Sequence, residues 1–132
     1  MVVDTSAVIA IISYEPEWPE LSRIAAGDSV LAMSAISVHE ASIVIARMMR
    51  DPRGAGLVDD FISELNIEVV PIDLDGARAA REAYFRFGKG YHQAALNLAD
   101  CFPYALARAR DEMLLFKGHD FLKTDIVPAW RP

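Results

Sequence analysis

Residues 1–13 read MVVDTSAVIAIIS and predict how the chain begins to fold. Met1–Asp4 is a short apolar run that ends in an acid, which is typical of a strand buried on both faces. Thr5 and Ser6 favour the start of a helix, and the apolar residues after them continue it towards a break at Pro16. A buried strand that leads directly into a helix indicates an α/β fold.

The rest of the chain continues this alternation of apolar runs and helical patterns. The further predicted strands are Ser29–Met33, Ile67–Pro71 and Met113–Phe116. The further predicted helices are Glu17–Ala26, Ser34–Arg50, Gly56–Leu65, Leu74–Phe87 and Ala94–Arg110. Pro103 is tolerated only near a first helical turn, so the last regular helix should begin close to Asp100. The pattern predicts a three-layer α/β/α sandwich with a central, mainly parallel sheet of four to five strands.

Length and composition narrow the class of protein. A chain of 132 residues suggests a single domain over residues 1–132. The formal charge of -6, from 13 Lys and Arg against 19 Asp and Glu, gives no overall attraction to nucleic acid. The one cysteine excludes an intramolecular disulfide, and no signal peptide or membrane-spanning run is visible. We therefore expect a cytoplasmic protein without a membrane segment.

Four carboxylates occupy positions in the sequence that are typical of catalytic or metal-binding residues. Asp4 and Asp120 follow predicted strands, and ligands of parallel sheets bind beyond the carboxyl ends of the strands. Asp100 lies in an apolar stretch, and Glu40 lies within a helix. The neighbours of Glu40 at helical spacing are Ile36, Ile43 and Val44. A carboxylate among apolar side chains is costly unless it is paired or binds a metal.

Taken together, the four carboxylates indicate a site for a hard cation such as Mg²⁺ or Mn²⁺, which prefer oxygen ligands. Each residue also has a purely structural interpretation. Asp4 and Asp100 can cap helices, Glu40 can pair with a distant arginine, and Asp120 can stabilise a turn.

Four segments resemble the VapC-type PIN-domain toxins, which are the ribonuclease halves of type II toxin–antitoxin pairs. These segments are MVVDTSA, SVHEAS, LNLADCFPYALA and LLFKGHDFLKTDI. The resemblance runs from Met1 to about Ile126 and implies a PIN-like fold. His119 stands at a position that is often acidic in relatives, which removes one negative charge beside Asp120.

The resemblance implies Mg²⁺-dependent cleavage of RNA, such as tRNA or another structured RNA, with Mn²⁺ as a substitute ion. It implies Asp4, Glu40, Asp100 and Asp120 as catalytic residues. Asp4 and Asp100 are the best-supported metal ligands, and Glu40 and Asp120 are further candidates. Thr5, Ser6 and Asp125 are candidate auxiliary residues.

The resemblance also implies partners. The candidate RNA-backbone contacts are Arg86, Lys89, His92 and Lys117, and Tyr91 offers a ring that can stack on an unpaired base. A solvated loop is the alternative interpretation of this basic stretch. A VapB-like antitoxin would block the acidic crevice, with an inserted Arg or Lys as a natural inhibitor. A homodimer, and a hetero-oligomer with the antitoxin, are further expectations.

Three other classes of function compete with a nuclease. A non-catalytic RNA-binding or adaptor domain would keep the fold without needing the acids. A phosphatase with an aspartate after the first strand would want a second acid two positions on, where this chain has Ser6. A receiver domain would want an acidic pair near Asp4, which the sequence lacks.

Overall fold

A computed structural model describes residues 1–27 and 30–131. Its sheet has four strands in the order β3-β2-β1-β4, and every pairing is parallel. The strands are β1 (Val2–Val3), β2 (Ala32–Ser34), β3 (Glu68–Val70) and β4 (Leu114–Leu115). The chain winds outwards from β1 to β2 and β3 and then returns to the other side of β1. A reversal of this kind opens a crevice at the carboxyl ends of the strands.

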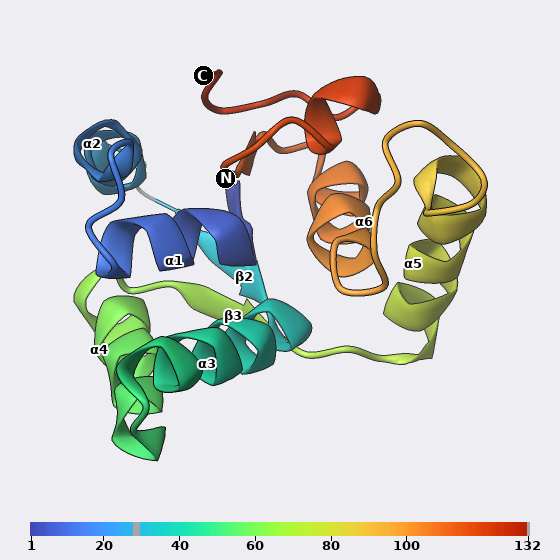
Figure 1. The fold of residues 1–132 in the computed structure, drawn as a ribbon. Coiled ribbons are helices and arrows are strands. Elements are labelled where there is room, and N and C mark those ends of the chain that lie inside the picture. The colour runs from blue at the N-terminus through green and yellow to red at the C-terminus, as the bar shows by residue number, and fades with distance from the viewer. Residues whose placement is uncertain (28–29, 132) are drawn as a thin grey trace.

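Helices cover both faces of this sheet (Figure 1). On one side are α1 (Thr5–Ile12), α2 (Trp18–Gly27), α3 (Ala35–Met49) and α4 (Gly56–Glu64), with the 3-10 helix η1 (Pro52–Ala55) between the last two. On the other side are α5 (Leu74–Phe87) and α6 (Cys101–Arg110), and η2 (Phe121–Lys123) follows β4. The predicted α/β/α sandwich with a parallel sheet is therefore confirmed.

The side chains of β1, β2 and β4 alternate between two buried cores, which explains why these strands appear in the sequence as continuous apolar runs. One core takes Val3, Met33 and Leu115, which pack with the helices α1 to α4. The other takes Val2, Ala32 and Leu114, which pack with α5 and α6. Among the described residues, none of the helices has the length and apolar character needed to span a bilayer.

The predicted helix over Ala94–Arg110 is wrong in its first part, because α6 begins only at Cys101. Leu96 instead forms a parallel bridge with Gly88, and Ala95 has a left-handed φ of 52°. Pro103 is then the third residue of α6, within the first turn, where its missing N–H costs nothing. The segment before Asp100 is therefore not helical and forms the loop that connects α5 to α6.

The predicted strand Ser29–Met33 is also displaced along the chain. The observed strand is Ala32–Ser34, because pairing with β1 joins Ala32 to Val2. Ser29 lies outside the described residues, and Val30 is exposed and precedes the strand. Ser34 ends this strand and also caps α3, since its hydroxyl accepts a hydrogen bond from the Ile36 amide.

Candidate active site

Asp4 lies where β1 ends and α1 begins, and only 4% of it is exposed. Its Oδ2 accepts hydrogen bonds from the Ser6 amide at 2.9 Å and from the Ser6 hydroxyl at 2.5 Å. Burial raises the pKa of Asp4 to about 6, against the effect of these bonds, and the charges of Asp100 and Glu40 add to the increase. Asp4 is both the helix cap that its position suggested and a buried carboxylate that faces other acids.

Asp100 lies directly before α6 and is partly buried. A reciprocal pair of hydrogen bonds fixes it: the Asn97 amide donates to Oδ2 of Asp100 at 2.7 Å, and the Asp100 amide donates to Oδ1 of Asn97 at 3.0 Å. This arrangement is a capping box, which here begins the turn that leads into α6. Burial raises the pKa of Asp100, and repulsion from Glu40 and Asp120 adds to it while Asn97 opposes it.

Glu40 is half-buried on α3, and its surroundings differ from those predicted. The buried line of α3 is Ser37, Ala41 and Ile45, whereas Ile43 beside Glu40 is 42% exposed. Glu40 therefore lies at the edge of the core and not on a closed apolar face. Asp120 precedes η2 with an exposed side chain, 3.9 Å from the Lys123 ammonium.

The structure brings these four carboxylates from distant parts of the chain into one electrostatic group. Asp4 and Asp100 each experience the charge of Glu40, Asp4 also experiences Asp100, and Asp100 experiences Asp120. Such mutual repulsion is unfavourable in the protein alone and is relieved by a bound cation.

The donor set fits a cation that keeps most of its water. Both hydrogen bonds to Asp4 fall on Oδ2, so within the described part of the chain its Oδ1 accepts none. Residues 1–27 and 30–131 contain no ready-made group of three His, Cys, Asp or Glu side chains that could hold a metal ion. Mg²⁺ is commonly held by one or two carboxylates together with waters and substrate phosphate oxygens. Asp4 and Asp100 supply that number.

The three candidate auxiliary residues have different surroundings. Ser6 touches the site, because its hydroxyl donates to Asp4 and accepts from the Lys117 amide at 3.0 Å. The Thr5 hydroxyl is buried and donates to the Ser37 carbonyl at 3.4 Å, so it ties α1 to α3. Asp125 accepts a hydrogen bond from the Tyr104 hydroxyl at 2.6 Å, which makes it part of the packing beside α6.

Lys117 directs its ammonium group towards acids on the α1–α2 side of the molecule. It forms ion pairs with Glu15 and with Glu17, the latter at 2.9 Å. These contacts connect the turn after β4 with the loop between α1 and α2. The predicted role of Lys117 as an RNA contact therefore competes with two internal partners.

The basic stretch after α5 is also partly committed to internal contacts. Arg86 pairs with Asp125 at 3.0 Å. Burial opposes ionisation of Asp125, but the Tyr104 hydroxyl and the nearby guanidinium groups keep the pKa of this carboxyl below its usual range. His92 accepts the Ala94 amide on Nδ1 at 3.1 Å, which is a structural role. Lys89 is exposed and forms no ion pair within the described residues.

Asn97 lies beside Asp100 in the structure but is not among the candidate site residues predicted from the sequence. The side-chain oxygen of Asn97 accepts a hydrogen bond from the backbone N–H of Asp100, and the backbone N–H of Asn97 donates to the Asp100 carboxylate. The signal was present as Asn-x-x-Asp before an apolar helix, which is the spacing of a capping box.

Comparison with known proteins identifies the family and supports the fold. Residues 1–127 match the PIN domain family. The chain is 45% identical to ribonuclease VapC of Mycolicibacterium smegmatis over 96% of this chain and 98% of the relative. It is 40% identical to ribonuclease VapC30 of Mycobacterium tuberculosis over the full length of both chains. The chain belongs to the VapC-type PIN-domain family.

Solved structures carry the same fold as this PIN domain. Mycobacterium tuberculosis VapC20, described as a sarcin–ricin loop cleaving toxin, aligns with a TM-score of 0.80 at 19% identity over 99% of this chain and 98% of that one. A toxin–antitoxin complex from Klebsiella pneumoniae aligns at 0.71 and 17% identity, over 99% and 98% of the two chains. At these identities the likeness supports the architecture of this PIN domain and no more.

Proposed function

We propose that this PIN domain is a divalent-metal-dependent endoribonuclease that acts as the toxin of a type II toxin–antitoxin pair. The observation that carries the proposal is the electrostatic coupling of Asp4, which follows β1, with Asp100 and Glu40, and of Asp100 with Asp120. A non-catalytic RNA-binding domain has no need for buried acids that repel one another. The names of the curated relatives, ribonuclease VapC and ribonuclease VapC30, support the same activity.

Each acid has a role in this proposal. Asp4 and Asp100 would hold Mg²⁺, for which Mn²⁺ can substitute. When bound, the cation supplies Lewis acidity towards a phosphate oxygen and lowers the pKa of water. Glu40 or Asp120 accepts the proton of the attacking water or completes the set of ligands. Ser6 and Asn97 hold Asp4 and Asp100 in place through the hydrogen bonds described above.

A cleavage assay tests the activity. The purified chain is incubated with total RNA or tRNA in Mg²⁺, in Mn²⁺ and in chelator, and the RNA ends are sequenced. We expect discrete cuts that need the metal and disappear in Asp4→Asn. Asp60→Asn, an exposed aspartate of α4, is the matched control and should cut normally. Equal cleavage by wild type and Asp4→Asn would rule out the acidic site as the catalyst, and no cleavage by either would rule out a nuclease.

We also propose a VapB-like antitoxin, a homodimer and a cytoplasmic location for the complex. Two solved structures with the same fold support the antitoxin, namely the toxin–antitoxin complex from Klebsiella pneumoniae and VapBC2 of Rickettsia felis bound to promoter DNA. The cluster of acids is a natural target for an inserted Arg or Lys. On α3, Ile43, Met48 and Met49 are each between 42% and 54% exposed, which leaves apolar surface for a partner. Co-purification with the product of a neighbouring gene, followed by mass measurement, tests both assemblies.

A further inference from the structure

An apolar groove runs between α5 and the start of α6, with a volume of about 290 Å³. Its lining is almost entirely apolar and includes Tyr84, Phe85, Leu98, Cys101 and Phe102. Phe85 is 52% exposed and Leu98 is 70% exposed, which is unusual for side chains of this kind. Exposed apolar surface gathered in a hollow indicates a binding site and not a folding core.

The groove borders the turn that carries Asp100. Leu98 lies in this capped turn, Cys101 begins α6 directly after it, and both residues line the groove. Asp100 precedes Cys101 directly, so the candidate metal ligand and the groove wall are neighbouring residues of one backbone. A molecule that places a phosphate beside Asp100 therefore brings its adjoining groups to the mouth of the groove.

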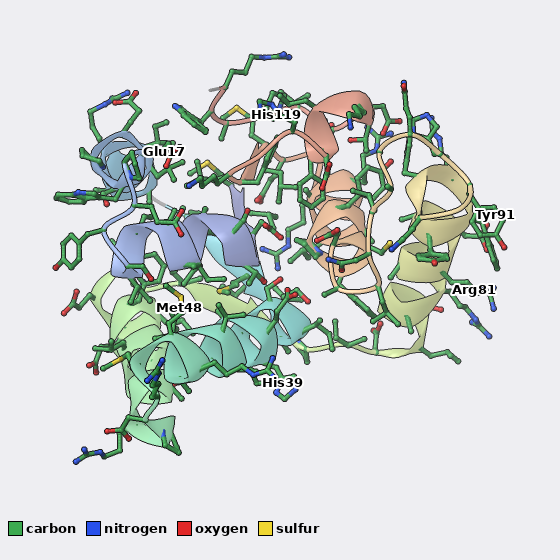
Figure 2. All side chains as sticks on the ribbon, viewed as in Figure 1. Glu17, His39, Met48, Arg81, Tyr91 and His119 are labelled. Carbon is green, nitrogen blue, oxygen red and sulfur yellow. The ribbon has the colours of Figure 1, made fainter. Side chains whose placement is uncertain are left out.

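Aromatic rings and a cation border the groove. Tyr91 packs edge-on against Tyr84 at 5.9 Å and against Phe85 at 5.6 Å between ring centroids, which braces these two groove residues. Arg81 lines the groove with a side chain that is 60% exposed and lies 3.5 Å from the exposed carboxylate of its neighbour Glu82. Figure 2 shows Arg81 and Tyr91 projecting from the α5 side of the molecule. Flat apolar walls with a guanidinium at the rim suit a planar ring that is attached to an anionic backbone.

We infer that this groove binds one unpaired base of the RNA substrate, next to the phosphate that the acids cut. The inference rests on the proposed ribonuclease function and extends it to how the RNA is held. The groove is at the small end of ligand sites, which suits a single ring better than a folded protein element. Because the lining offers so few polar groups, the groove contacts the face of a base by stacking and does not form hydrogen bonds with the edge of that base. The protein should therefore need a base at that position and accept any of the four.

Binding to short single-stranded RNA tests the groove. The RNA carries one 2-aminopurine, or one abasic nucleotide, moved along the strand, and Asp4→Asn is used so that the RNA stays intact. We expect quenching of 2-aminopurine at one position, and about tenfold weaker binding when that position is abasic. Exchange of one base for another at that position should change affinity much less.

Variants of the groove give the second measurement. Phe85→Ala and Leu98→Ala should each weaken RNA binding about tenfold and raise KM while leaving kcat nearly unchanged. Leu74→Ala is the matched control, because Leu74 is 65% exposed on the same helix and lies outside the groove. Circular dichroism and thermal melting establish that all three variants fold.

The outcomes separate this inference from the proposed function. If wild type cuts RNA in Mg²⁺ but Leu98→Ala and Phe85→Ala behave like Leu74→Ala, the groove does not hold a base and the nuclease stands. If these two variants convert a dimer into a monomer in sedimentation, the groove is an interface between copies and the inference is wrong. If wild type cuts no RNA, the proposed function itself fails.

Discussion

The Ser6 hydroxyl lies 2.5 Å from Oδ2 of Asp4, and the Ser6 amide donates to the same oxygen. The same hydroxyl accepts the amide of Lys117, which follows β4. Ser6 therefore joins the ends of two neighbouring parallel strands and fixes the orientation of the Asp4 carboxylate. One oxygen of Asp4 is occupied by these bonds, and the other can face a ligand.

Ser6→Ala should raise the pKa of Asp4, because it removes a hydrogen bond that favours the charged carboxylate. We expect cleavage at neutral pH to fall about tenfold, with the midpoint of the pH–rate profile moved to higher pH. Ser42→Ala is the control, since the Ser42 hydroxyl donates to the Val38 carbonyl within α3. An unchanged midpoint of the pH–rate profile would mean that Ser6 stabilises the fold but does not affect the ionisation of Asp4.

The activity of wild type should depend on pH through Asp4. With a pKa of about 6, Asp4 is protonated below that pH and loses its ability to bind a cation. Cleavage should therefore rise as pH increases through about 6, and more Mg²⁺ should move the midpoint downwards because the metal competes with the proton. The measurement is a set of pH–rate profiles at several Mg²⁺ concentrations. A midpoint that does not change with Mg²⁺ concentration would contradict this prediction.

Asp4→Asn should abolish cleavage and yet stabilise the metal-free protein at neutral pH. The folded protein holds the Asp4 proton more tightly than the unfolded chain does, with a pKa of about 6 against 3.8. The free energy of unfolding therefore falls as pH rises between these values, by up to about 3 kcal/mol. Asn cannot ionise, and it can still accept the Ser6 bonds.

Urea unfolding in chelator at acidic and neutral pH measures this effect. The gain of Asp4→Asn over wild type should be largest above about pH 6 and small at the acidic end. The free energy of unfolding of Asp60→Asn, an exposed residue of α4, should stay within about 0.5 kcal/mol of the wild-type value at both pH values. A wild type that gains stability as pH rises through this range would show that Asp4 is not a strained buried acid.

Asn97→Ala should remove the capping box and free Asp100 to turn away from the other acids. We expect a loss of about 1 kcal/mol in unfolding free energy, and a fall in Mg²⁺ affinity measured by calorimetry. Asn97→Ser, which can still cap, should recover most of both. Gln93→Ala, in the same loop and exposed, is the control. Unchanged Mg²⁺ affinity in Asn97→Ala would exclude Asn97 from positioning the site.

Lys89 and Lys117 should differ in how they act on RNA binding. Lys89 is exposed and without an ion pair among the described residues, so Lys89→Ala should lower the slope of log affinity against log salt by about 1. Lys117 is paired with Glu15 and Glu17, so Lys117→Met should lower stability and leave the salt slope nearly unchanged. Equal slopes for the two variants would place both lysines on the RNA.

Local patterns were enough to predict much of this fold. Met1–Asp4 and Met113–Phe116 read as buried strands because both of their faces are covered, and helix α5 was predicted over its whole observed length. Asp4 and Asp120 were singled out because they follow strands. These inferences need only neighbouring residues.

Tertiary relationships explain what the sequence could not show. The extended path before Asp100 depends on Leu96 pairing with Gly88, and helical propensity alone favoured a longer helix. The ion pairs of Lys117 join residues about one hundred positions apart, which no local pattern reports. Glu40 is half-exposed because the core takes the line of Ser37 and Ala41, a choice made by the packing of α3.

The pairing of β1 with β4 has a consequence for the order in which this enzyme becomes complete. Strand β1 is synthesised long before its partner β4, because Val2 and Val3 pair with Leu114 and Leu115, and the Ser6 hydroxyl accepts its hydrogen bond from the Lys117 amide. A nascent chain therefore carries Asp4 without a finished scaffold around it until β4 has been synthesised. Nuclease competence arrives only after β4 and Lys117 have been synthesised and β4 has paired with β1.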